Sequence, residues 1–195
     1  LAELMIQAAE QAGIPRTRDF NGATQEGVGF YQATLTGARR CSAAHGYLKP
    51  ARGRSNLLIQ TGAVVAEVLI EGGRALGVRY RVDGQERVAR ARAEVLLCAG
   101  AIGSPQILML SGIGPAAELA RHGIALKVDA PEVGANLQDH LVVPLMWRLK
   151  DGQASMNQRL GGMRVVLEVL NYLLRKRGAM TMPAAEVGIF LRSRP

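Results

Sequence analysis

The residues best suited to hold a ligand lie between 94 and 114, where the chain reads EVLLCAGAIGSPQILMLSGIG. An apolar run ends at Ala99 and Gly100, and the missing side chain of a glycine lets another group approach the backbone closely. Ser104 and Pro105 are a favourable pair for opening a helix, whose free amide groups would point back toward the strand end. This arrangement suits an anionic ligand at the carboxyl end of a parallel strand. It suits an ordinary strand–turn–helix packing unit equally well, and the spacing alone does not separate the two.

The three histidines are the residues best suited to move protons, but none stands at a recognisable spacing from a serine or cysteine nucleophile. His45 lies in a predicted short helix, and His122 precedes Gly123 at a predicted helix end, where an imidazole is a common C-terminal residue. His140 ends a polar loop at residues 136–140, which can order around a ligand or a partner domain. The sequence therefore assigns no catalytic residue.

The two cysteines, Cys41 and Cys98, lie far apart and belong to no C-x-x-C motif or Cys/His cluster. No metal site and no redox disulfide is therefore predicted. Cys98 falls inside an apolar run, where a cysteine behaves as a small hydrophobic residue, so we expect it to be buried. A cytoplasmic location is the default expectation, and peripheral association of the longer protein with a membrane stays open as an alternative.

Hydrophobic periodicity and breaker residues predict the elements that must position these groups. Residues 16–40 are expected to form a long structured loop, since they are rich in Gly, Asn, Thr and Arg without a clear period. Helices are predicted at residues 2–12, 42–48, 104–112, 115–122 and 163–177, the second of them capped by Ser42 and ending before Pro50. Single strands are predicted at residues 124–130, 141–150 and 186–193.

Two further strand patterns differ in kind. From residue 56 to 93 the period changes to two, with turns at residues 71–74 and at Asp83–Gly84, which predicts an antiparallel meander with one solvated, arginine-rich face. Residues 94–100 are apolar throughout, and such a continuous run is typical of a buried strand in a parallel sheet. The chain is thus expected to be α+β.

Composition excludes several classes of protein. The 195 residues contain 24 Lys and Arg against 16 Asp and Glu, a net charge of +8, but the basic residues are dispersed and no aromatic residues alternate with them. Nucleic-acid binding is therefore not predicted. No apolar run approaches the ~18 residues of a membrane span, and the first residues carry no export signal. The absence of an initiator Met fits a segment of a longer protein.

A family resemblance rests on residues 100–114, which fit the pattern G-A-x-x-S-P-x-I-L-x-x-S-G-I-G. This pattern resembles the second signature of the glucose–methanol–choline (GMC) oxidoreductases, which use FAD. Residues 19–63 and 133–140 resemble neighbouring segments of that family, and the final FLRSRP is similar to its choline dehydrogenase branch. Cys41 departs from the Ser or Thr expected at its position.

The resemblance implies a fold and a domain organisation. The chain would be an α+β fragment of an FAD-binding α/β fold of the GMC type, with a three-stranded antiparallel meander, a buried parallel-type strand and helices. Residues 1–40 would be a loop region of the substrate domain, residues 41–140 part of the FAD-binding domain, and residues 141–195 part of the substrate-binding domain.

The resemblance also points to residues that would contact FAD. Val65 matches a valine whose backbone groups meet the adenine, and Ala99 with Gly100 match the segment that lies against the ADP half of the cofactor. Glu186 falls in substrate-domain territory and could face a cationic substrate, or could be an ordinary exposed strand residue. Three more carboxylates lie near family-like segments: Asp19, Glu26 and Asp139.

Two parts of the family pattern are missing. The N-terminal βαβ unit with G-x-G-x-x-G is absent, and residues 112–117 match G-x-G-x-x-A by letter only, because they follow a helix and include Pro115, which lacks an amide donor. The C-terminal histidine motif is absent too. The chain by itself is therefore expected to be inactive, to hold FAD weakly or not at all, and to self-associate through exposed sheet edges.

The implied parent is an FAD-dependent alcohol dehydrogenase or oxidase. It would convert a small-molecule alcohol to an aldehyde or ketone by hydride transfer to the flavin. The alternative is a non-catalytic binding module that retains part of the fold.

Overall fold

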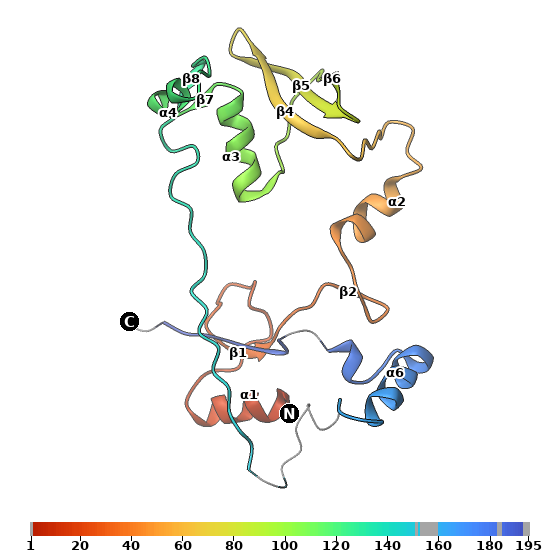
Figure 1. Ribbon diagram of the computed structural model, residues 1–195. Coiled ribbons are helices and arrows are strands. Elements are labelled where there is room, and N and C mark those ends of the chain that lie inside the picture. Colours follow the sequence, from red (N-terminus) through yellow and green to blue (C-terminus); the bar gives the residue numbers. More distant parts are fainter. Residues whose placement is uncertain (1, 151, 153–159, 183–184, 193–195) are drawn as a thin grey trace. The chain divides into compact units, whose positions relative to one another are not determined.

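The computed structural model describes residues 2–150, 152, 160–182 and 185–192. It divides into two compact units, one formed by Leu1–Leu57 with Met146–Pro195 and the other by Leu58–Leu145 (Figure 1). The division predicted at residues 40 and 140 concerns FAD and substrate binding, and it stays a prediction.

The first unit is built on a helix packed against a two-stranded sheet. Helix α1 (Ala2–Gln11) confirms the predicted N-terminal helix, and strand β1 (Gly27–Phe30) pairs antiparallel with β9 (Val187–Phe190), within the predicted C-terminal strand. Ile6, Ala9 and Val28 form the buried core, with Ile14 and Val187 partly buried against it. The apolar face of α1 thus packs against both β1 and β9, which lie far apart in the sequence.

The predicted long loop at residues 16–40 contains short strands instead. Besides β1, it holds the two-residue strands β2 (Leu35–Thr36) and β3 (Arg39–Arg40), which pair antiparallel. Strands this short leave no readable two-residue period, so the sequence pattern missed them. The chain passes so close to itself here that a Cβ on Gly29 would overlap the backbone oxygen of Thr17.

An exposed ion pair joins α1 to the segment that follows it. Arg16 Nη1 and Nη2 donate to Glu3 Oε1 and Oε2, both at 2.8 Å. These hydrogen bonds lower the pKa of the Glu3 carboxyl and raise the pKa of Arg16. Because the pKa of Glu3 is lowered on folding, its small contribution to stability is present above the ordinary glutamate pKa and is lost as the pH falls through the lowered value.

Residues 43–51 form one continuous helical segment rather than a helix that ends before Pro50. A π-helical turn η1 (Ala44–Leu48) leads directly into α2 (Lys49–Ala51). Pro50 is the second residue of α2 and has no amide proton to continue the helical hydrogen bonds of η1 at this point. The hydroxyl of Ser42 accepts a hydrogen bond from the His45 amide at 3.2 Å, as a capping residue does.

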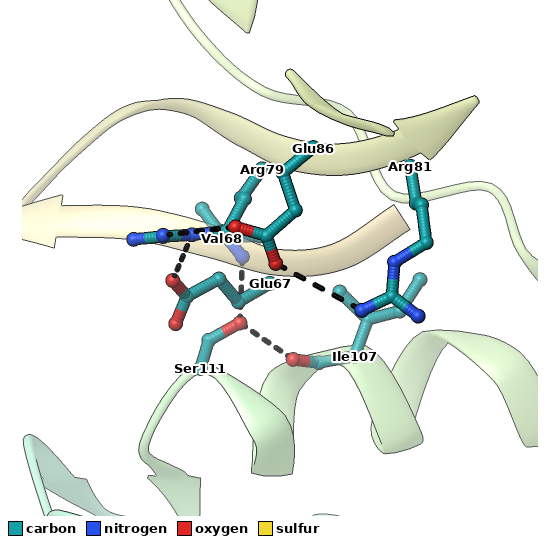
Figure 2. Close-up of polar contacts among 7 residues, drawn as sticks. All are labelled: Glu67, Val68, Arg79, Arg81, Glu86, Ile107 and Ser111. Carbon is teal, nitrogen blue, oxygen red and sulfur yellow. Dashed lines mark hydrogen bonds and ion pairs between the residues drawn. The ribbon is translucent and has the colours of Figure 1, made fainter. Parts of the chain in front are cut away.

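The second unit contains the predicted antiparallel meander. Its strands are β4 (Val64–Glu71), β5 (Arg74–Val82) and β6 (Gln85–Arg90), in that order. Asp83 and Gly84 have φ of 51° and 77°, as a tight hairpin turn requires. The arginine-rich face is partly neutralised: Arg79 Nε donates to Glu67 Oε1 at 2.8 Å, and Glu86 lies within ion-pair distance of Arg79 and Arg81 (Figure 2).

Helix α3 (Gly100–Leu110) follows the meander and packs alongside β4 (Figure 1). It begins four residues earlier than the predicted start at Ser104. The corner after it holds a short parallel pair, β7 (Ile113–Gly114) with β8 (Val128–Asp129), around α4 (Ala116–Arg121). The predicted helix–helix corner at residues 112–117 therefore includes a strand, and the strand predicted at residues 124–130 is reduced to two residues.

A buried serine joins α3 to the sheet. Ser111 is 1% exposed, and its hydroxyl donates to the carbonyl of Ile107 at 2.5 Å while it accepts the amide proton of Val68 at 2.8 Å (Figure 2). Val68 lies on the outer strand of the meander, and its amide is one of the backbone groups that point away from the sheet. The serine thus satisfies an edge group that would otherwise be buried without a partner.

Two predicted strands do not form. Residues 94–98 have no strand structure, and Leu96 (74% exposed) and Cys98 are exposed rather than buried. Residues 141–150 are also without regular structure, with Trp147 85% exposed. A strand forms only where a neighbouring strand completes its backbone hydrogen bonds, and the described part of the chain pairs no strand with either segment.

The C-terminal part of the first unit is helical. Helix α6 (Arg164–Arg175) confirms the helix predicted at residues 163–177, and a 3₁₀ turn η2 (Ala179–Thr181) follows it.

The Ser111 bridge predicts a stability effect. Ser111→Ala leaves the Val68 amide buried without an acceptor, which should lower the free energy of unfolding by about 1–3 kcal/mol. Ser104→Ala is the matched control, because its hydroxyl accepts an exposed amide and water can replace it; we expect a change below about 0.5 kcal/mol. Urea unfolding of both variants measures the difference. Equal losses of unfolding free energy in the two variants would show that the Ser111 hydrogen bonds contribute no more to stability than an exposed one.

The close approach at Gly29 predicts a second effect. Gly29→Ala forces β1 away from Thr17 and should destabilise the protein by roughly 1–3 kcal/mol, as overpacking does. Gly53→Ala is the control, since a Cβ there meets nothing within 4 Å. Thermal unfolding should show a lower midpoint for the first variant alone, and unchanged midpoints for both would refute the close packing.

Candidate functional site

The candidate ligand site is the start of α3, where both predicted cofactor-binding residues of this turn are exposed. Ala99 is the residue before the helix, and its amide donates to the hydroxyl of Ser104 at 3.1 Å. Ser104 therefore acts from within the helix, holding the turn closed, rather than as the residue that precedes it. Ser104 thus stabilises the start of the helix as predicted, but it lies inside the helix and not at the capping position.

Gly100 combines an unusual backbone with open space. Its φ is +82°, a conformation that L-residues rarely adopt, and a Cβ built on it meets nothing within 4 Å. The glycine is therefore required by its backbone conformation and not by crowding from the described chain. Free space lies beside a helix start whose first amide groups have no partner within the helix. A ligand can approach the backbone here.

Val65 lies on the outer strand of the meander, half-buried and opposite Tyr80 of β5. The amide of Ala91 donates to the carbonyl of Leu76 at 2.9 Å, so alternate residues of β5, including Val78 and Tyr80, direct their backbone groups toward β6.

It follows that the backbone groups of Val65 point away from β5. Val68 faces Val78, two residues from Tyr80, and it offers its amide outward to Ser111. Val65 has the same orientation, because Ala66 is an extra residue in a β-bulge. A ligand along this edge could therefore exchange hydrogen bonds with Val65, which is the backbone role predicted for it.

The histidines do not form a catalytic group in the described structure. His122 Nε2 lies 3.0 Å from Glu118 Oε1, a local helix-end contact as expected. His45 and His140 are exposed, and the amide of His140 donates to Asp139 at 2.7 Å within the polar loop.

The carboxylates of Asp19 and Glu26 each accept a hydrogen bond, whereas Glu186 is bonded through its backbone. Asp19 Oδ1 accepts from the Asn21 amide at 2.9 Å, and Glu26 Oε1 accepts from the Arg192 amide at 3.2 Å. Glu186 is half-buried, and its backbone carbonyl accepts a hydrogen bond from the Tyr31 amide.

Among the residues that the structure describes, no cluster of three His, Cys, Asp or Glu side chains could hold a metal ion. Within those same residues, no helix is both long and apolar enough to cross a membrane.

A feature that the sequence pattern did not reveal is an open, shallow groove of about 500 Å³ beside the helical segment η1–α2. Tyr47, Leu48 and Leu57 give it an apolar wall, and Arg54 contributes a charge. The signal was present: residues 44, 47, 48 and 51 follow helical spacing along one face. The continuation of the helix through Pro50 is what builds this wall.

Solved structures share the arrangement of the chain. A fungal aryl-alcohol oxidase superposes with a TM-score of 0.85 at 28% identity, covering 97% of this chain and 33% of the oxidase. An FAD-dependent oxidoreductase from Chaetomium thermophilum gives a TM-score of 0.80 at 27% identity, covering 95% of this chain and 33% of that protein. The fold is thus the predicted mixed α/β part of a GMC FAD-binding fold.

The sequences of curated proteins support the same family assignment. The chain is 42% identical over 194 residues to the oxygen-dependent choline dehydrogenase of Photobacterium profundum, and 41% identical over 202 residues to the alcohol dehydrogenase (acceptor) of Pseudomonas putida. Both alignments cover 100% of this chain but only 34% and 36% of the relatives, so the chain spans about a third of their length. Residues 1–142 match the family model described as GMC oxidoreductase. On this agreement, the chain belongs to the GMC oxidoreductase family.

Proposed function

We propose that this chain is part of an FAD-dependent oxidoreductase that oxidises an alcohol to an aldehyde or ketone. The observation that carries the proposal is the GMC match over residues 1–142, together with the exposed turn at Ala99–Gly100 inside the signature segment. The names of two relatives, a choline dehydrogenase and an alcohol dehydrogenase, support an alcohol substrate. A cytoplasmic location stays a prediction.

The residues present fit an FAD molecule at the edge of the second unit. The open side of Gly100 leaves room for the nucleotide end of the cofactor, and the first amides of α3 favour a negative charge nearby. The outward backbone groups of Val65 suit the polar edge of an adenine. When bound, FAD supplies the hydride acceptor for alcohol oxidation.

This chain contributes binding and positioning in that scheme. Ser104 holds the turn before α3 by accepting the Ala99 amide, and Ser111 fixes the other end of α3 to β4. The strand that bears Val65 and the helix that begins at Gly100 are thus held as one packed pair. The proton of the alcohol is left to a base outside this segment, since none of the three histidines here matches the catalytic histidine motif of the family.

Gly100→Val in the complete enzyme should lower the FAD content of the purified protein about tenfold or more. The branched side chain would fill the open space and disfavour the positive φ, a cost of order 1–3 kcal/mol. Gly84→Val is a matched control, because Gly84 also has a positive φ (+77°) and nothing within 4 Å of a built Cβ, but lies at the meander turn.

Flavin absorbance per protein and the affinity for added FAD measure the effect. Normal flavin content in Gly100→Val, or equal losses in both variants, would reject the assignment of Ala99–Gly100 to the cofactor.

The activity itself is tested on the complete enzyme under anaerobic conditions. Addition of choline, primary aliphatic alcohols or aryl alcohols should bleach the flavin absorbance, and a dye acceptor or oxygen should restore it. The acceptor that restores it faster separates a dehydrogenase from an oxidase. A protein that binds no flavin, or whose flavin no alcohol reduces, would refute the proposed function.

A further inference from the structure

Among the described residues, the one buried polar side chain joins the two elements of the candidate cofactor site. Ser111 lies at the end of α3, and its hydroxyl accepts the amide proton of Val68 on β4 at 2.8 Å (Figure 2). The same strand carries Val65, and the same helix begins at Gly100. A movement at this contact therefore changes the position of one proposed cofactor contact relative to the other.

Helix α3 is anchored to its unit at its C-terminal end. Besides the Ser111 hydroxyl, the side chain of Met109 packs closely there, since a Cβ built on Gly114 would lie 2.8 Å from Met109 Cγ. Near the start of the helix, the Ser104 hydroxyl accepts the Ala99 amide of the same turn, so it holds the turn and not the helix against the sheet. The position of the helix start is thus determined from the far end.

The length of α3 magnifies a displacement at that end. Its 11 residues rise about 16 Å, so a tilt of about 10° about the last turn would move the start by roughly 3 Å. Binding contacts generally need their groups held within about 0.5 Å. Loss of the Ser111 contact would therefore misplace Gly100 relative to Val65 even while the helix stays folded.

A serine hydroxyl satisfies one amide of β4 without covering the neighbouring groups. A further strand paired along β4 would occupy every outward backbone group of that edge, those of Val65 included. Ser111 meets the requirement of Val68 alone, and the backbone groups of Val65, three residues earlier, keep their outward direction. The contact thus closes the strand edge at one residue and leaves it available to a ligand at another.

We propose that Ser111 is a positioning residue for FAD. Its hydroxyl holds the start of α3 and the edge of β4 at the separation that lets one cofactor contact both. The proposal rests on the proposed function, because it takes Val65 and Gly100 as cofactor contacts. A ligand held at two points loses affinity when those points move relative to each other, so Ser111 acts on the cofactor through the two elements that it joins.

The test measures the release of FAD from the complete enzyme. Ser111→Ala should speed the release about tenfold or more, and Ser111→Thr should restore most of the normal rate, because threonine keeps the hydroxyl. Leu119→Ala is the matched control, since it removes a buried side chain of α4 and leaves both hydrogen bonds of Ser111 in place. This control should lower the thermal midpoint at least as much as Ser111→Ala does, without changing the release of FAD.

Hydrogen exchange tests the same coupling without any substitution. If the contact favours FAD binding, bound FAD favours the contact by the same factor. The Val68 amide of the unaltered protein should therefore exchange about tenfold more slowly with FAD bound than after FAD is removed, relative to the Leu119 amide as an internal reference. An exchange ratio that FAD does not change would overturn the proposal, even where Ser111→Ala fails to fold.

The outcomes separate this proposal from the proposed function. An unaltered protein that holds no FAD would refute both the enzyme function and the role of Ser111. Equal release of FAD from the unaltered protein and from Ser111→Ala would refute the role of Ser111 alone. Equally fast release from Ser111→Ala and Leu119→Ala would do the same, because general destabilisation would then account for the loss.

Discussion

The second unit depends on one hydroxyl group. Ser111 is nearly inaccessible, and its oxygen links the last turn of α3 to the outer edge of β4 by two hydrogen bonds. Because α3 otherwise has no fully buried residue, this polar contact, rather than a large apolar core, fixes how the helix lies against the sheet. The contact thereby fixes the helix that begins at Gly100 against the strand that carries Val65.

The edge of β4 explains why a serine serves this purpose. An outer strand leaves alternate backbone groups without partners, and these must meet water, a side chain or a ligand. At Val68 the partner is Ser111, and at Val65 the same orientation leaves the groups directed outward. One strand edge thus combines a structural contact and a binding contact three residues apart, which ties the proposed cofactor site to the stability of the unit.

Local patterns predicted what local interactions decide. The meander followed from its two-residue period and Asp83–Gly84, and α1 and α6 followed from their apolar spacing. The predicted start of α3 was four residues too late. The helix begins directly at Gly100, whose positive φ forms the turn into it, and no capping rule predicts such a start. The strand at residues 94–100 was wrong because a parallel strand is decided by a neighbour distant in sequence. The outward orientation of Val65 depends on the bulge at Ala66, which the residue pattern did not reveal.

Two groups of exposed apolar residues differ in what their backbone requires. Those at residues 94–98 and 141–149 lie on segments without regular structure, so they need both side-chain burial and backbone partners, which only further polypeptide can supply. Helix α6 already satisfies its own backbone hydrogen bonds, so its exposed side chains, such as Leu167 and Leu174, need only an apolar surface to pack against. The same degree of exposure thus has two structural consequences: the unstructured segments lack strand partners as well as side-chain packing, whereas α6 lacks side-chain packing alone.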